Sequence, residues 1–176
     1  MSSDTLKVKV STPIEPILPG RGFYQVEEDE LYVQVGPFSK KRRFFSYLES
    51  DDVRFDIDRQ GRLIFIEVAR SSRRWQVVPQ LNPPRIIEAA SIRWLGFRAR
   101  TSNPLLLTVA GCTRLLIQYT DRTHLKSYFL AESVVAQVDE YNRLAAVWIT
   151  DISEDRAGHR MAAFRKQLRG KPEPFS

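Results

Sequence analysis

Four aspartates form an acidic cluster in the first half of the chain. Asp51, Asp52, Asp56 and Asp58 lie close together, and grouped carboxylates can bind a metal ion or transfer protons. The spacing Asp56-x-Asp58, however, follows the outward face of a strand, and the segment lacks the glycine and the distant glutamate of a calcium loop. We interpret the cluster as a solvated strand face with Asp58 bonded into a turn, and we predict no bound metal.

Nucleophilic and metal-ligating residues are sparse. The chain contains only two histidines, His124 and His159, and one cysteine, Cys112. A zinc site or a Cys/His nucleophile requires more ligands at suitable spacing. The sequence Gly20-Arg21-Gly22 lacks the Lys-Ser/Thr of a phosphate-binding loop. The sequence therefore predicts a protein that is not an enzyme and carries no cofactor.

Arginines beside aromatic residues give a stronger signal. Segment 70–105 contains seven arginines and one glutamate, and its charge of +6 equals that of the whole chain. Guanidinium groups next to aromatic rings are typical both of nucleic-acid contacts and of protein-interface hot spots. Arginines on the outward face of a strand whose Trp points inward would need neither kind of partner. A second basic run, followed by two phenylalanines, lies in a separate loop. The candidate partner-binding residues are Lys40, Lys41, Arg42, Arg43, Phe44, Arg73, Arg74, Trp75, Arg93, Trp94, Arg98 and Arg100.

Two stretches of the sequence are similar at a constant separation. Residues 46–63 return as 127–144 at an offset of 81, and 31–35 match 115–119 at an offset of 84. Apolar and polar residues alternate at 53–58, which predicts a half-buried strand. Gly61 corresponds to Asn142, and both residue types tolerate positive φ, so we expect equivalent hairpin turns. The strand expected after each turn is apolar on both of its faces. In the first copy we expect Ile64, Ile66 and Val68 on one face and Leu63 and Phe65 on the other.

The repeat predicts a mainly β fold. We expect two tandem four-stranded antiparallel units packed as a pseudo-twofold sandwich or barrel, with a short C-terminal helix, because one such unit cannot bury both faces of its central strand. The predicted divisions are an extended arm (1–21), a first β repeat (22–69), a basic structured linker (70–105), a second β repeat (106–150), and an amphipathic helix and tail (151–176).

Segments outside the two copies are also expected to carry structure. Extended pieces are predicted at 6–10, 75–78 and 92–97, and a helical turn at 85–91. A cap residue followed by glutamate at 151–154 predicts the start of the C-terminal helix, with Met161, Phe164 and Leu168 as its apolar stripe. Three prolines make 11–21 an extended arm, which we expect to be mobile in the isolated protein. We expect removal of residues 1–19 and 170–176 to leave the melting temperature nearly unchanged and to weaken association with a partner.

The first copy resembles a family of very short prokaryotic domains of unknown function. The match lies in Leu-Tyr-Val at 31–33, Asp-Asp-Val at 51–53 and the hairpin at 56–68. The second copy keeps Asp139 and Arg143-Leu144 but has Asn142 for Gly61 and Trp148 for Glu67. The resemblance implies a β fold and no particular activity. Single-copy members would need to self-associate to bury a core, so the tandem copy is expected to be a covalent version of that dimer.

The sequence predicts a non-enzymatic scaffold or accessory subunit that docks onto a larger protein assembly. The alternative is a nucleic-acid-binding regulatory protein, antitoxin-like, that would use the Arg/Trp-rich linker. No segment is long and apolar enough to span a bilayer, and the first residues lack a secretory signal. One cysteine fits a reducing compartment, so we expect a cytoplasmic protein without membrane insertion. Homo-oligomer formation stays open.

Overall fold

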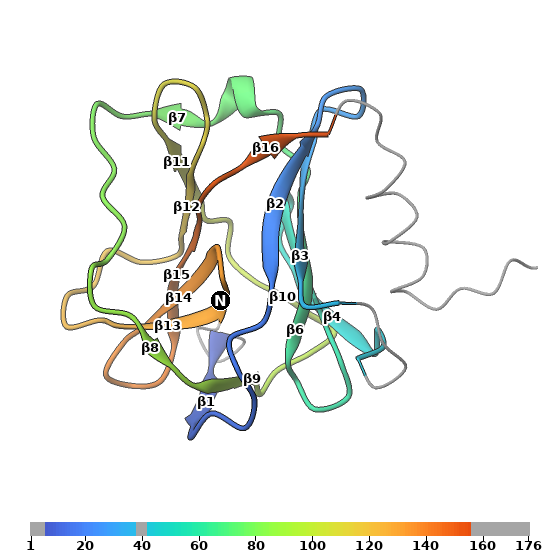
Figure 1. Cartoon of the computed structure of the whole chain (residues 1–176), viewed down its shortest axis with the longest axis vertical. Helices are drawn as coiled ribbons and strands as arrows, with labels where there is room; N and C mark the ends of the chain where they lie inside the picture. The colour runs from blue at the N-terminus through green and yellow to red at the C-terminus, as the bar shows by residue number, and fades with distance from the viewer. Residues whose placement is uncertain (1–5, 38–41, 156–176) are drawn as a thin grey trace, which may run out of the picture.

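Two seven-stranded sheets lie face to face, and a two-stranded sheet lies at one end of them (Figure 1). This computed structural model describes residues 6–37 and 42–155. The mainly β prediction is confirmed. The sheets are open, so the barrel alternative is wrong. Within the described part of the chain, no helix has the length and apolarity needed to cross a membrane.

The first copy supplies five strands of one sheet, where four were expected. In spatial order this sheet contains β10 (Ala99–Arg100), β4 (Ser46–Glu49), β5 (Val53–Ile57), β6 (Leu63–Val68), β3 (Glu30–Val35), β2 (Gly20–Gln25) and β16 (Ser153–Glu154). Strands β2 to β6 pair antiparallel, while β10 and β16 are short parallel strands at the two edges. The missed strand is β2, which begins inside the predicted arm.

The second sheet has the same arrangement. Its order is β8 (Glu88–Ala89), β13 (Lys126–Ala131), β14 (Val134–Val138), β15 (Leu144–Ile149), β12 (Leu115–Gln118), β11 (Leu105–Thr108) and β7 (Gln76–Val77). Val53 pairs with Val68 in the first sheet, and Val134 pairs with Ile149 in the second, at the offset of 81 seen in the sequence. The hairpin register is therefore the same in both sheets.

A β-bulge in each hairpin changes the expected faces of the central strand. Asp56 pairs with Phe65 and Ile57 pairs with Leu63, so Ile64 is the extra residue. The bulge turns Ile64 outward beside Phe65, whereas Leu63 packs inward with Ile66. The sequence-based assignment of Ile64 and Ile66 to one face is wrong, because strict alternation does not account for an inserted residue.

The two turns have the expected backbone conformation. Gly61 has φ of 81° and Asn142 has φ of 58°. The carboxylate of Asp58 accepts hydrogen bonds from the backbone N–H groups of Gln60 and Arg62, both at 2.9 Å, and Asp139 accepts the equivalent pair in the second turn. These aspartates act as turn formers, as interpreted for Asp58 from the sequence. Asp56 and Asp58 are 0% and 2% exposed, so the interpretation of the acidic cluster as a solvated strand face is wrong for these two residues.

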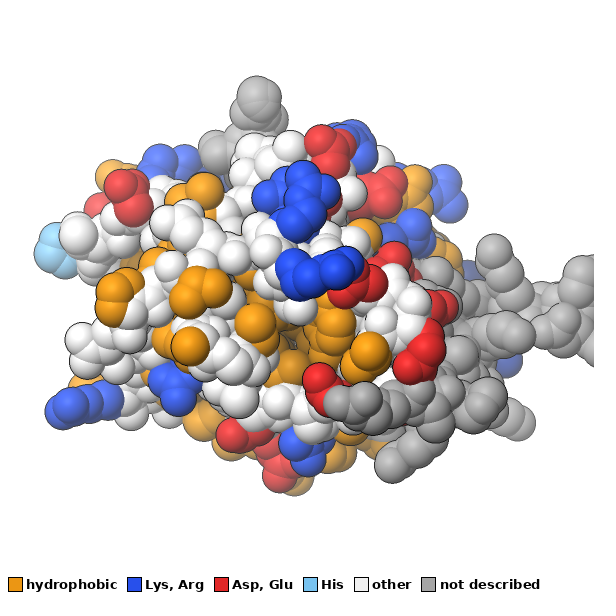
Figure 2. Space-filling model, turned by 90° about the horizontal axis from the view of Figure 1, so that it is seen from above, with side chains coloured by type: hydrophobic (Ala, Val, Ile, Leu, Met, Phe, Trp, Pro, Cys, Tyr) orange, Lys and Arg blue, Asp and Glu red, His pale blue; other side chains and the backbone are white. Residues whose placement is uncertain are grey.

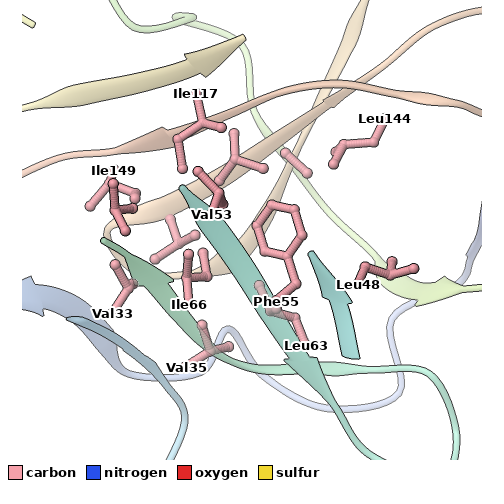
Figure 3. Close-up of a cluster of buried hydrophobic side chains, with 14 of the residues drawn as sticks. Val33, Val35, Leu48, Val53, Phe55, Leu63, Ile66, Ile117, Leu144 and Ile149 are labelled. Atoms are coloured by element: carbon pink, nitrogen blue, oxygen red, sulfur yellow. The ribbon is translucent and has the colours of Figure 1, made fainter. Parts of the chain in front are cut away.

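One core lies between the sheets. Its side chains come from both of them, as Figure 3 shows for Val33, Phe55 and Ile66 of the first sheet and Ile117 and Ile149 of the second. All five are at most 1% exposed, and burial of each contributes roughly 1.5–3 kcal/mol to folding. The two copies are thus stabilised by each other.

The segment that follows each copy adds an edge strand to the sheet of the other copy. After β6 the chain crosses to the second sheet, where β7 pairs with β11. After β15 it crosses back, and β16 pairs with β2. Residues 153–154 are therefore a strand and not a helix start, and β8 replaces the helical turn predicted at 85–91. Residues 156–176, including the predicted apolar stripe, lie outside the described residues.

The two-stranded sheet joins the arm to both hairpin turns. Its strands are β1 (Val8–Ser11) and β9 (Ser91–Trp94). The N–H of Val8 donates to the carbonyl of Asn142 at 2.9 Å, and the N–H of Trp94 donates to the carbonyl of Gly61 at 2.7 Å. Leu6 and Val8 are buried in the core, so this part of the arm belongs to the folded body.

Candidate partner-binding surface

Two of the basic, aromatic segments predicted from the sequence meet at the β4–β10 edge of the first sheet. Strand β10 pairs with β4, with Ala99 opposite Leu48, and the N–H of Arg98 donates to the carbonyl of Tyr47 at 2.7 Å. The rings of Phe45 and Phe97 contact each other edge to face, with centroids 5.8 Å apart. Pairing of β4 and β10 therefore brings together residues about fifty positions apart in the chain.

Guanidinium groups cover the aromatic rings at this edge. Arg59 lies over Phe45 at 5.3 Å from the ring centroid, and Arg54 lies over Tyr47 at 4.3 Å. The charge of Arg54 is compensated by the buried Asp56, whose Oδ1 lies 2.8 Å from Nε. Cation–π contacts of this kind attract the guanidinium group to the face of the ring and contribute about 0.5–1 kcal/mol at exposed sites. We call the surface the arginine–phenylalanine edge and define it by Phe45, Tyr47, Arg59, Phe97 and Arg98, together with Arg43 and Leu95, which stand two residues before Phe45 and Phe97 in the chain.

Large hydrophobic side chains are exposed on this edge. Phe97 is 53% exposed and Leu95 is 56% exposed, whereas most phenylalanines and leucines of the β strands are buried. Arg43, Arg59 and Arg98 are also exposed. Exposed apolar side chains among arginines are typical of protein-binding surfaces.

The other residues of the predicted basic loop have different positions. Lys40 and Lys41 lie outside the described residues. Arg42 is buried, and its Nη2 donates to the carbonyls of Val35 and Leu63, both at 3.0 Å. Phe44 is half-buried and packs on the outward cluster of Tyr32, Ile64 and Phe65. Arg42 thus cannot act as an exposed docking residue, because its guanidinium binds the ends of β3 and β6.

The two candidate tryptophans belong to the core. Trp75 is 3% exposed, donates from Nε1 to the carbonyl of Arg70 at 3.0 Å, and packs edge to face on Tyr24. Trp94 is 2% exposed and contacts the ring of Phe55. Their assignment to a partner surface is wrong for this structure, because neither ring can stack on a base or a partner side chain without unpacking the core.

The remaining linker arginines are spread over the molecule. Arg73 and Arg74 lie in the short 3₁₀ helix η2 (Ser72–Arg74), directly before β7. Arg73 is ion-paired with Asp29 at 3.0 Å. Figure 2, seen from the end that carries β7 and β16, shows Lys and Arg side chains beside Asp and Glu, with hydrophobic side chains between the sheets. Arg93 is half-buried in β9 at the other end (Figure 1).

Arg100 lies next to the arginine–phenylalanine edge but is engaged with a carboxylate. Its Nη2 is 2.5 Å from Oδ1 of Asp51. This hydrogen bond, with a second one from Asn103, holds the pKa of Asp51 below its usual value. At the far end, the Tyr24 hydroxyl, followed by Ser71 and Arg73, similarly lowers the pKa of Asp29. The predicted basic residues therefore form no single continuous surface.

Sequence reasoning missed several members of the edge. Phe45, Leu95 and Phe97 stand inside the segments that were singled out, but Tyr47 and Arg59 gave no separate signal. Their proximity depends on the parallel β4–β10 pair, which has only two residues on each strand. Among residues 6–37 and 42–155, no group of three His, Cys, Asp or Glu side chains could hold a metal ion.

The comparisons with protein families and with curated proteins found no match for this chain. No protein-family model matches it, and no curated protein matches it. The resemblance to short prokaryotic domains thus stays a prediction, and the functional argument depends on the geometry of the described residues.

Proposed function

We propose that this chain is a non-catalytic scaffold subunit that docks a protein partner on the arginine–phenylalanine edge. The observation that carries the proposal is the meeting of two separate basic, aromatic segments on one sheet edge. Phe97 and Phe45 are in contact there, and their arginine neighbours are exposed. Aromatic residues and arginine dominate the binding energy of protein interfaces.

The charge of the edge indicates the chemistry of the partner. Within the described part of the chain, Arg43, Arg59 and Arg98 form no ion pair with a carboxylate. Their unpaired charges favour an acidic surface, and the exposed ring of Phe97 favours an apolar pocket within it. We therefore propose a partner that presents carboxylates around a hydrophobic depression.

Differences between the two copies support a role for this edge in particular. The position of Arg59 is occupied by Glu140 in the second copy, and that of Phe45 is occupied by Lys126. We infer that the two units are related by a pseudo-twofold axis, which the shared hairpin register and strand order support. On this basis the second sheet presents a different edge, and the scaffold binds its partner on one side.

The nucleic-acid alternative has less support. It was based on arginines that stand next to Trp75 and Trp94, and both rings are buried. Stacking of bases on aromatic rings requires exposed rings. The linker arginines also lie at both ends of the molecule, so they do not line one path for a phosphate backbone.

The experiment compares single variants in pull-downs from a nuclease-treated lysate of the source cells. Phe97→Ala removes the exposed ring, and Arg59→Glu introduces the residue of the second copy. Tyr141→Ala is the matched control, because Tyr141 is 62% exposed and lies next to Arg143 on the other unit. We expect protein partners retained by wild type and Tyr141→Ala to be lost from both edge variants.

Two results would contradict the proposal. Partners recovered equally by Phe97→Ala and wild type would show that the edge is not the docking surface. Partners lost from wild type after nuclease treatment would instead favour the nucleic-acid alternative. Circular dichroism of each variant verifies that the fold is retained.

A further inference from the structure

A small cavity lies under the arm and contains a buried guanidinium group. Its volume is about 60 Å³, and its walls come from arm residues 13–18, from Arg42 and Arg62, and from Phe129 of the second sheet. Two cationic side chains in so small a cavity require negative charge nearby, because a buried ion without a partner is strongly destabilising.

Arg42 is held in this cavity by its neighbours. Gly36 has φ of 78°, and a Cβ atom there would lie 3.3 Å from the guanidinium carbon of Arg42, so glycine provides the room for the side chain. Nη2 is bonded to two backbone carbonyls, of Val35 and Leu63. The side chain is 8% exposed, yet Nε and Nη1 have no hydrogen-bond partner among residues 6–37 and 42–155. The guanidinium is therefore held in place by Nη2, while the N–H donors of Nε and Nη1 stay unused.

One carboxylate, Glu15, faces both arginines without bonding closely to either. Its Oε1 lies 3.7 Å from Nη1 of Arg42 and 3.8 Å from Nη1 of Arg62. Both distances exceed the range of a direct hydrogen bond, and the Glu15 side chain is 41% exposed. The other nearby carboxylate, Asp58, is already bonded to Nε and the backbone N–H of Arg62.

We propose that the Arg42–Arg62 cavity is a binding site for a small oxyanion, and that Glu15 is its exchangeable internal occupant. The charges of Arg42, Arg62, Asp58 and Glu15 balance. When Glu15 swings out, one positive charge remains in the cavity, together with the unused donors of Arg42. The volume suits a single carboxylate or phosphate group. Guanidinium groups bind both through charge-assisted hydrogen bonds.

The second copy shows the same turn without such a site. There Asp139 accepts hydrogen bonds from Nε of Arg143 at 3.1 Å and from Nη1 of Arg122 at 3.2 Å. The second arginine is thus paired directly with the turn carboxylate and is 43% exposed. In the first copy Arg42 comes from the loop that is longer by three residues, and it does not reach Asp58 in this way. The oxyanion site is consequently a property of the first copy.

The test uses inorganic phosphate and the full chain at constant ionic strength, with sodium chloride as the reference salt. Heteronuclear NMR follows the Nε–H resonance of Arg42, and calorimetry measures affinity. We expect phosphate to shift this resonance in the wild-type protein. Glu15→Gln removes the competing carboxylate, and because so exposed an ion pair is weak, the affinity should rise by about twofold to sixfold. Acetate in a parallel titration distinguishes carboxylate from phosphate as the preferred anion.

Asp51→Asn is the matched control, because it also removes an exposed carboxylate that is paired with an arginine, and Asp51 lies in the β4–β5 turn, at the opposite end of β5 from the Asp58 turn. It should leave phosphate affinity unchanged, whereas Arg62→Gln should lower it at least tenfold. A wild-type Arg42 resonance that responds to neither anion would overturn the proposal. So would a Glu15→Gln variant that melts at a lower temperature and binds no more tightly, since Glu15 would then be a structural partner of the two arginines.

Discussion

Replacement of Gly61 by asparagine separates the two reasons for a glycine at this turn. The equivalent residue of the second copy is Asn142, with φ of 58°, so asparagine tolerates the backbone conformation. Gly61 has a further constraint, because a Cβ atom there would lie 2.4 Å from the carbonyl oxygen of Trp94. We therefore expect Gly61→Asn to destabilise the protein even though its counterpart is asparagine.

The expected loss of stability in Gly61→Asn can be estimated from the contacts that the new side chain would weaken. To reach an ordinary contact of 3.4 Å, strand β9 has to move by about 1 Å. This displacement weakens the hydrogen bond from Trp94 N–H to the carbonyl of Gly61, which contributes about 1 kcal/mol. It also loosens the packing of Trp94 on Phe55, for which we assign about 1–2 kcal/mol. The expected loss is about 2–3 kcal/mol, or about 4–12 °C in Tm for a chain of this size.

Urea unfolding measured by circular dichroism gives the free energies. The reciprocal variant, Asn142→Gly, is the control, and its effect should stay below about 1 kcal/mol because glycine relieves the positive φ and adds flexibility to the unfolded chain. If Gly61→Asn is as stable as wild type within about 0.5 kcal/mol, then the close approach of β9 to this turn does not constrain the residue, and our account of the glycine is wrong.

Three further predictions concern the arm, the acidic end and the tryptophans. Val8→Ala should reduce the free energy of unfolding by about 2 kcal/mol, because Val8 is 2% exposed in the core. An unchanged urea midpoint would show that this part of the arm does not contribute to stability. The pKa of Asp29, measured by NMR titration, should lie below 3.8 and should rise in Tyr24→Phe, because the Tyr24 hydroxyl is the largest cause of the lowering. A lowered carboxylate pKa stabilises the folded protein above the pKa of the unfolded state. This stabilisation is lost as the pH falls through the pKa of the folded state. Iodide and single-stranded RNA should quench tryptophan fluorescence little, because Trp75, Trp94 and Trp148 are all at most 6% exposed; strong quenching by RNA would restore the stacking hypothesis.

Local pattern was sufficient to predict the hairpins. The alternation of Val53, Phe55 and Ile57 and the turn residues Gly61 and Asn142 depend on neighbouring residues alone, and these strands and turns occur as expected. The bulge at Ile64 was missed because one inserted residue reverses the faces without changing the composition of the strand.

Contacts between distant segments could not be predicted. Trp75 and Trp94 were assigned to a surface because they stand beside arginines, yet each indole is core and only its neighbours are exposed. The ion pair of Arg42 with Glu15 joins the long loop to the arm, and neither segment has a repeating pattern. Likewise β8, β10 and β16 contain two residues each, so their sequences carry too little periodicity to indicate a strand.

The comparison of the two copies distinguishes positions that serve the fold from positions that are free to serve a partner. Asp58 and Arg62 recur as Asp139 and Arg143 with the same hydrogen bonds, because every such turn needs them. Arg59 does not recur, and it lies on the exposed edge over an aromatic ring. Arg42 likewise comes from a loop that is longer only in the first copy. The second hairpin folds without an arginine at the position of Arg59, so we infer that binding accounts for Arg59. Arg42 bonds to the ends of β3 and β6, and we infer that binding accounts for its unused donors.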